Sequence, residues 1–207
     1  MTPKPALPLY LRPARLDDLE SLARWRLEWA DIVARRERAA GRAPSGFWQR
    51  EYARWKQERW VERGRTFMAS LDDSPIALPI ATVTLDDEPE PDTDLWTPQE
   101  LERPARFMSK LMRAPTDELA PAGVGRLLVA WCRSEAARQG AELVRGDVWT
   151  GYWPTNPDGQ NTALQGWYLR LGWRHIRTAP DVVSGWLMEI DAAKDPIADE
   201  RVIRARP

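Results

Sequence analysis

The sequence predicts a mixed α/β fold in one domain, and three observations support this. Apolar segments with a helical period and short extended segments follow one another in the order β, α, α, β, β, β, α, β, α, β, β. Three strands in succession exclude a doubly wound Rossmann sheet, in which strands and helices alternate throughout. A composition of 43% hydrophobic and 29% charged residues among 207 allows one sizeable core. We expect residues 1–190 to form the domain and the charged residues 191–207 to form a loose tail.

The N-terminal third contains one predicted strand and two predicted helices. Residues 9–13 (LYLRP) form a short extended segment that ends at a proline. An apolar stripe, with acidic residues in the first turn where the helix dipole favours negative charge, predicts a helix over 16–39. Residues 41–46 (GRAPSG) interrupt it, and a second helix continues to Gly64. Five of the 12 tryptophans lie in these helices at helical spacing, so we interpret them as packing residues: Trp25, Trp29, Trp48, Trp55 and Trp60.

The middle of the chain contains three extended segments, which are residues 66–71, 76–85 and 106–113. Residues 86–103, which are acidic and rich in proline, are predicted to be an exposed loop. A helix is predicted over 123–139, because an apolar period begins after a glycine turn and ends at Gly140.

The last third continues this mixed pattern. A strand over 142–149 leads to a loop over 150–160 that carries tryptophan and proline. A helix over about 161–171 ends at Gly172. Two final strands, WRHIRT and SGWLMEI, precede the charged C-terminal residues.

The composition excludes several classes of function. A formal net charge of −1 gives no electrostatic footprint for a nucleic acid or an anionic membrane surface. Cys132 and His175 are each the single residue of their type, which excludes an intrachain disulfide and a zinc site built on cysteine, so we expect no metal. No signal peptide opens the sequence and no apolar run approaches ~18 residues, so we expect a soluble, cytoplasmic protein.

A turn of small residues, PAGVG at 121–125, runs directly into the helix predicted over 123–139. Glycine is a weak helix former, and it is favoured where another group must approach the backbone closely. A phosphate is the usual partner, because the first turn of a helix carries unpaired N–H groups and a partial positive charge. The turn is therefore either a phosphate site or a plain loop-to-helix junction.

Two motifs in this order of elements resemble the GNAT superfamily of acyl-CoA-dependent N-acetyltransferases, of bacterial type. The first is the pyrophosphate loop, matched by APAGVG with Gly123 and Gly125 in place but with Ala120 where glutamine or arginine is usual. The second is matched by NTALQGWYLRLGW, which runs from Asn161 to Trp173. The resemblance covers about residues 8–190 and implies a mixed, mostly antiparallel sheet flanked by helices on both faces.

The resemblance also implies acetyl-CoA as co-substrate and a set of residues that bind it. Backbone N–H groups of the glycine turn would hold the pyrophosphate, and Arg126 either adds charge there or is simply solvated. Free backbone groups at the end of the fourth strand would pair with the pantetheine amides. Asn161 would bind the pantetheine arm, although it serves equally well as a helix N-cap. The implied binding residues are Leu111, Met112, Arg113, Pro121, Ala122, Gly123, Val124, Gly125, Arg126, Asn161 and Tyr168.

The implied reaction is direct attack of an amine on the thioester in a ternary complex. Tyr168 is the candidate acid that protonates the leaving thiolate, and its alternative role is packing beside Trp167 and Trp173. The amine must lose a proton, and Asp147 is the candidate base, with Asp117 and Glu118 as alternatives.

The loop over 150–160 carries Tyr152 and Trp153, which we assign to the acceptor side, where they would favour an apolar or aromatic amine. We expect a small-molecule amine as acceptor and no nucleic acid or membrane partner, and a homodimer is compatible with the sequence. The alternatives are a peptide or protein acceptor, or a non-catalytic acyl-CoA sensor with the same fold.

Overall fold

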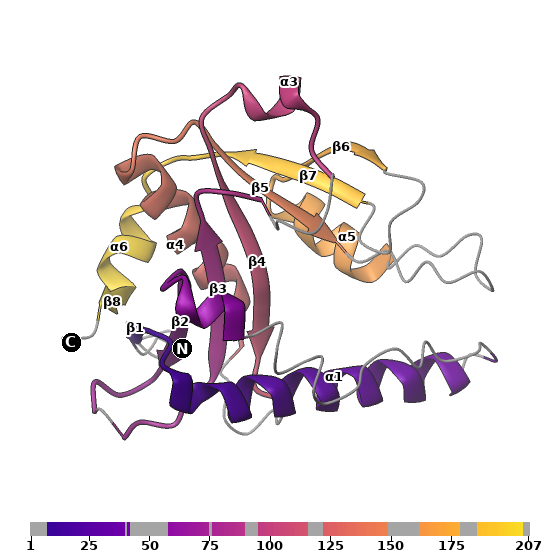
Figure 1. Cartoon of the computed structure of the whole chain (residues 1–207), viewed down its shortest axis with the longest axis vertical. Coiled ribbons are helices and arrows are strands. Elements are labelled where there is room, and N and C mark those ends of the chain that lie inside the picture. The colour runs from indigo at the N-terminus through magenta and orange to yellow at the C-terminus, as the bar shows by residue number, and fades with distance from the viewer. Residues whose placement is uncertain are drawn as a thin grey trace, which may run out of the picture.

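The computed structural model describes residues 8–39, 41, 58–74, 76–89, 95–115, 122–148, 162–178 and 186–204. These residues build one eight-stranded sheet in the order β6-β7-β5-β4-β3-β2-β1-β8 (Figure 1). Helices lie on both faces of this mostly antiparallel sheet, as the resemblance implies. Only β4 with β5 and β1 with β8 pair in parallel among these neighbours. The strands are β1 (Leu9–Pro13), β2 (Thr66–Ser70), β3 (Ala81–Asp86), β4 (Ala105–Arg113), β5 (Leu143–Val148), β6 (Arg174–Thr178), β7 (Trp186–Asp191) and β8 (Val202–Arg204).

The helices of the described residues differ in length and in the face of the sheet that they cover. They are the 3₁₀ turn η1 (Leu16–Asp18), α1 (Leu19–Ala39), α3 (Pro98–Leu101), α4 (Val124–Arg138), α5 (Thr162–Arg170) and α6 (Pro196–Arg201). Residues 58–62 are also helical, at the end of the second helix that the sequence predicts. None of these helices is long and apolar enough to cross a membrane.

Alternation along the strands divides the core between the two faces. In β2, Met68 packs with Leu22 and Trp25 of α1, whereas the next residue, Ala69, belongs to the large core that includes α4. In β4, Phe107 packs with Trp96 ahead of α3, whereas the next residue lies in the large core. Successive side chains of a strand point to opposite faces. One face is therefore covered by α4, α5 and α6, and the other by α1 and the segment that contains α3.

The turn from β1 into α1 is fixed by one carboxylate. Asp18 accepts hydrogen bonds from both guanidinium nitrogens of Arg12, at 2.6 and 2.7 Å, and from the backbone N–H of Arg15 at 2.7 Å. The bidentate bond to Asp18 raises the pKa of Arg12 above its ordinary value. These bonds hold the start of α1 against the end of β1, so α1 leaves the sheet in a defined direction.

The C-terminal segment differs from the loose tail that the sequence predicts. Residues 196–204 form α6 and β8, and Ala198 and Val202 are buried in the core. Asp195 caps α6 by accepting hydrogen bonds from two backbone N–H groups of its first turn, and Pro196 occupies the first helical position. Aspartate followed by proline is a helix start signal that outweighs the high local charge.

Two further boundaries differ from the prediction in the middle of the chain. The predicted exposed loop over 86–103 contains α3, which begins with a reciprocal capping box between Thr97 and Glu100. The strand predicted from residue 76 begins only at Ala81, since Pro79 interrupts the preceding segment. The other predicted strands, and the helices over 16–39, 123–139 and 161–171, are confirmed to within a few residues.

Candidate active site

The two central parallel strands separate part-way along their length. β4 and β5 pair only through Ala105 with Leu143, Arg106 with Val144, and Phe107 with Arg145. Beyond this point β4 continues to Arg113 beside β3, and β5 continues to Val148 beside β7 (Figure 1). The backbone edges of β4 and β5 beyond Phe107 therefore do not pair with each other. A gap between two strands in the middle of a sheet is a docking place for an extended ligand.

Gly146 lies where the two strands begin to part. A Cβ at this residue would lie 3.0 Å from the backbone oxygen of Met108 and 3.4 Å from the Cε of Met188. A side chain at this position would push β5 away from β4 and move the point of separation. The sequence gives no signal for this role, because the close approach depends on the pairing of strands that lie far apart in the chain.

A β-bulge in β4 changes the direction of its backbone groups. The register with β3 shifts between Thr82 and Thr84, and Lys110 has a φ of 52°, in the left-handed region. Lys110 and Leu111 together lie opposite Val83. Bulges place one extra residue in a strand and redirect its neighbours, and they are frequent beside active sites.

The backbone of β4 after the bulge can be assigned to one side or the other. Ala114 N–H donates to Ile80 C=O at 2.7 Å, so it faces β3. Because adjacent residues direct their backbone groups to opposite sides, Met112 faces β3, while Leu111 and Arg113 face β5. The carbonyl of Arg113 is occupied, since the indole N–H of Trp29 donates to it at 2.8 Å. The backbone groups of Leu111 are thus directed into the gap.

Trp29 fixes α1 across the end of β4, which Figure 1 shows beside α1. Its ring also lies under the guanidinium of Arg113, with 5.6 Å between the guanidinium carbon and the ring centroid. The indole therefore has a polar contact in addition to the packing role that its helical spacing predicts. Sequence periodicity finds the buried side of such a residue but not the partner of its N–H group.

The glycine turn opens α4 as the sequence predicts. Gly123 is the N-cap with a φ of 91°, a left-handed conformation that strongly favours glycine, and a Cβ there would meet nothing within 4 Å. The first hydrogen bond of the helix joins Leu127 N–H to Gly123 C=O at 3.0 Å, so the N–H groups of Val124, Gly125 and Arg126 have no acceptor within the helix. No acidic residue lies in the first turn. Open space beside unpaired N–H groups fits a phosphate.

The two glycines of the turn have different surroundings. A Cβ at Gly125 would lie 3.6 Å from the Cζ2 atom of Trp167, so this glycine brings α4 close to α5. The side chain of Val124 is buried in the core, so Val124 offers a ligand only its backbone, whereas Ala122 and Arg126 are exposed. The turn therefore combines an open position at Gly123 with a helix contact two residues later.

Tyr168 lies on α5, in the core between α5, α4 and the sheet. It is 7% exposed, and its ring makes edge contacts with Trp167 and Trp173 at centroid distances of 4.8 and 5.4 Å. Burial raises the pKa of the phenol above its ordinary value, and the negative charge of Asp147 raises it further. The phenol is therefore protonated at neutral pH, which is the form that a general acid requires.

Asp147 approaches from the other face of the sheet. In β5, Val144 and Val148 belong to the large core with α4 and α5, so by alternation Arg145 and Asp147 point to the face that carries α3. Arg145 is buried there, donates to the carbonyl of Glu100 and pairs with Glu189 at 3.4 Å. Asp147 is nevertheless near enough to Tyr168 to raise its pKa. The two candidate catalytic groups thus belong to opposite faces at the point where β4 and β5 separate.

Several predicted site residues lie outside the described residues, so their placement stays a prediction. They are Pro121 of the glycine turn, Asn161 of the second motif, Tyr152 and Trp153 of the loop over 150–160, the alternative bases Asp117 and Glu118, and Ala120. Among the described residues, no three His, Cys, Asp or Glu side chains gather where they could hold a metal ion.

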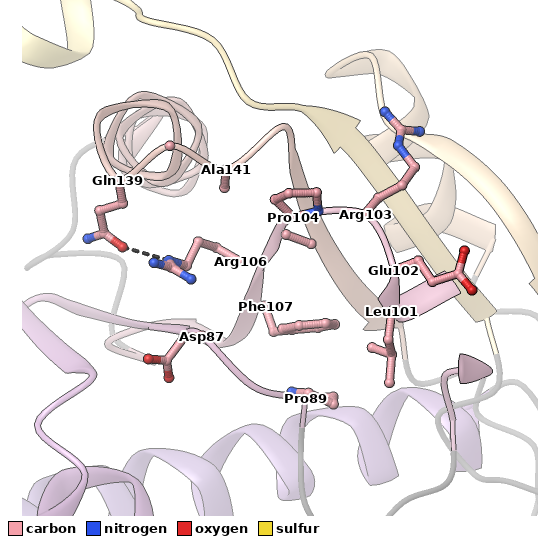
Figure 2. A pocket seen from close by; sticks show the side chains of 12 residues that line it. Asp87, Pro89, Leu101, Glu102, Arg103, Pro104, Arg106, Phe107, Gln139 and Ala141 are labelled. Atoms are coloured by element: carbon pink, nitrogen blue, oxygen red, sulfur yellow. Dashed lines mark hydrogen bonds between the residues drawn. The ribbon is translucent and has the colours of Figure 1, made fainter. Parts of the chain in front are cut away.

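A pocket of about 380 Å³ lies at the opposite end of β4 (Figure 2). Phe107 and Leu101 form part of its wall, and Arg106 donates to Gln139 at 2.7 Å across its rim. It adjoins the last turn of α4 and Gly140, where the helix dipole is negative and disfavours a phosphate. The pocket contains neither the glycine turn nor the part of β4 and β5 where the two strands separate, so we do not assign the reaction to it.

Solved structures with a similar fold were found, whereas no family model and no curated protein matches the chain. A GNAT-family acetyltransferase from Listeria monocytogenes 4b F2365 superposes with a TM-score of 0.59 at 14% identity, over 88% of this chain and 94% of that one. PaiA N-acetyltransferase from Thermoplasma acidophilum, solved in complex with coenzyme A, gives 0.53 at 15%, over 88% and 98%. The NatC complex bound to Gag peptide and CoA gives 0.51 at 15%, over 90% and 100%. The matched proteins share a fold with this chain.

Proposed function

We propose that this chain, which has the fold of the GNAT acetyltransferases, moves an acetyl or other short acyl group from acyl-CoA to the amine of a small molecule. The observation that carries the proposal is the separation of β4 from β5 after three residue pairs, next to the open glycine turn at the start of α4. An extended ligand with a diphosphate at one end fits both features. The structure of PaiA in complex with coenzyme A, which has the same fold, supports this choice of ligand.

The chain offers separate groups for each part of acetyl-CoA. The N–H groups of Val124, Gly125 and Arg126 would hold the pyrophosphate, with Gly123 leaving the space open. The backbone of Leu111 would pair with the pantetheine arm along the edge of β4. When bound, acetyl-CoA supplies an activated thioester carbonyl and a thiolate leaving group.

The residues at the gap would divide the proton transfers between the two faces of the sheet. Asp147, on the face that carries α3, would take a proton from the amine, directly or through water. An N–H group of β4 after the bulge would polarise the carbonyl oxygen. As the new C–N bond forms and the C–S bond breaks, Tyr168 on the α5 face would donate its proton to the sulfur. The two faces then correspond to the acceptor side and the coenzyme side of a ternary complex.

The acceptor class is tested by a screen for transfer. The purified protein would be incubated with acetyl-CoA and a panel of small amines, aminoglycoside-type amines and peptides, with free thiol as the readout and the acetylated product identified by mass. We expect a small amine to release thiol faster than the hydrolysis seen with acetyl-CoA alone. Release with peptides alone would favour a peptide acceptor. Tight binding of acetyl-CoA without release of thiol would favour a sensor and contradict the proposed reaction.

A further inference from the structure

The amide nitrogen of one buried glutamine on α5 has no hydrogen-bond partner among the residues that the structure describes. Gln165 is 6% exposed, and its Nε2 atom is buried without a hydrogen-bond partner in the described part of the chain. Buried polar groups in folded proteins are almost always hydrogen-bonded, and an unpaired buried donor destabilises the fold. A glutamine kept in such a position calls for a partner that is absent from the protein alone.

The position of Gln165 places it along the path expected for the coenzyme. It lies three residues before Tyr168 on α5, so the two side chains share one face of the helix and are about 4.5 Å apart along its axis. Trp167, on the same helix, lies 3.6 Å from the position of a Cβ on Gly125, so this part of α5 adjoins the glycine turn. Gln165 therefore lies one helical turn from the candidate acid, on the helix that packs against the start of α4.

The order of the chemical groups along coenzyme A can be compared with the order of these residues along the candidate site. Its pyrophosphate comes first, then a pantetheine arm with two secondary amides, and then the sulfur. With the pyrophosphate at Gly123 and the sulfur at Tyr168, the amides would cross the part of α5 that carries Gln165. A carboxamide and a secondary amide each contain a donor and an acceptor, so they pair in either orientation of the glutamine.

We propose that the Gln165 carboxamide hydrogen-bonds an amide of the pantetheine arm and positions the thioester beside Tyr168. This inference rests on the proposed function, because it requires coenzyme A in the gap between β4 and β5. The proposal implies that removal of the Gln165 carboxamide changes the stability of the free protein and the affinity for coenzyme A in opposite directions. The free protein loses an unpaired buried group and becomes more stable, whereas the complex loses a hydrogen bond and becomes weaker.

The test uses Gln165→Met, which keeps the length of the side chain, and Gln165→Leu, which keeps its approximate volume. Gln99→Leu, at an exposed position on α3, is the matched control for the same chemical change. Calorimetry would compare coenzyme A with 3′-phospho-ADP, which keeps the nucleotide and pyrophosphate but lacks the pantetheine arm. Thermal unfolding of each free variant would be recorded in parallel.

We expect Gln165→Met to weaken the binding of coenzyme A about 3- to 10-fold, as one neutral hydrogen bond would, and to leave 3′-phospho-ADP unchanged. The melting temperature of the free variant should rise by about 2–6 °C, and Gln99→Leu should change neither quantity. Unchanged binding of coenzyme A by both Gln165 variants would overturn the role of Gln165 and leave the proposed function intact. An equal loss of affinity for coenzyme A and for 3′-phospho-ADP would have the same consequence. A lower melting temperature in both variants would show that the carboxamide has a partner inside the protein. A parent protein that does not bind coenzyme A would overturn the proposed function, and this assignment with it.

Discussion

Replacing Tyr168 by phenylalanine separates catalysis from packing at the candidate acid. The substitution deletes one oxygen and keeps the ring that contacts Trp167 and Trp173. The hydroxyl makes no hydrogen bond to any residue that the structure describes, so no buried partner is left unpaired. The free energy of unfolding should therefore change by less than about 1 kcal/mol.

The rate should change far more than the stability. Loss of a positioned general acid typically costs ~10²–10⁴-fold, which corresponds to about 3–5 kcal/mol of transition-state stabilisation. The loss should appear in kcat, with the affinity for acetyl-CoA nearly intact, because the hydroxyl acts only as the C–S bond breaks. It should shrink with an aryl thioester, since a more acidic leaving thiol needs less help from an acid.

The pH dependence supplies a second measurement on the same residue. Burial first, and then the charge of Asp147, raise the pKa of Tyr168, so the parent protein keeps this proton at pH values above its ordinary value of 10.0. Asp147→Asn removes the second cause, so the pKa of Tyr168 should fall in this variant. Because Asp147 is also the candidate base, this pKa is read from the ultraviolet absorbance of tyrosinate in the free protein, and Tyr168→Phe is the control that lacks this titration. A Tyr168→Phe variant that turns over at the parent rate would refute the assignment and leave Tyr168 as a packing residue.

Four more substitutions, at three positions, test the site. Gly123→Ala should lower stability by about 1 kcal/mol through its left-handed φ, and Gly123→Asp should in addition abolish binding of acetyl-CoA in calorimetry by placing a negative charge at the pyrophosphate. Gly146→Val should lower stability by about 1–3 kcal/mol in thermal unfolding, because its Cβ would meet the Met108 oxygen at 3.0 Å; a melting curve equal to the parent's would contradict the close approach of β4 and β5. Trp153→Ala should raise the KM for the acceptor more than that for acetyl-CoA, whereas a collapse of stability would instead identify Trp153 as a core residue.

Local sequence signals predict the elements of this fold well where one residue decides the outcome. Gly140 and Gly172 end α4 and α5 because both adopt a positive φ, at 78° and 88°. Asp195 and Pro196 are a comparable local signal, because they mark the start of α6. The prediction gave more weight to the high charge of residues 191–207 and therefore expected a loose tail there. The high charge describes the exposed side of α6, whereas Ala198 and Val202 on its other side close the core.

The candidate site could be predicted only where its residues lie together in the chain. The glycine turn and Tyr168 belong to local motifs, and the structure brings their helices together through Gly125 and Trp167. Gly146 and the bulge at Lys110 depend on how β4 pairs with β3 and β5, which no local pattern specifies. The sequence predicts Gln165 only as an ordinary helix residue. Its proposed role is indicated by the structure alone, in which its Nε2 atom is buried without a hydrogen-bond partner among the described residues.

The pairing of β8 with β1 joins residues from the two ends of the described chain, with Leu9 opposite Val202. β8 is only three residues long and has one neighbour, so little backbone bonding opposes its release. It is tied to the core through α6, where Ser134 of α4 donates to Asp199 at 2.6 Å. α6 and β8 should therefore detach as one cooperative unit, and the amides of both segments should exchange with solvent deuterium at a common rate. Because that unit rests on α4 through Ser134, away from the glycine turn, its opening would expose the edge of β1 while the start of α4 keeps its contact with α5.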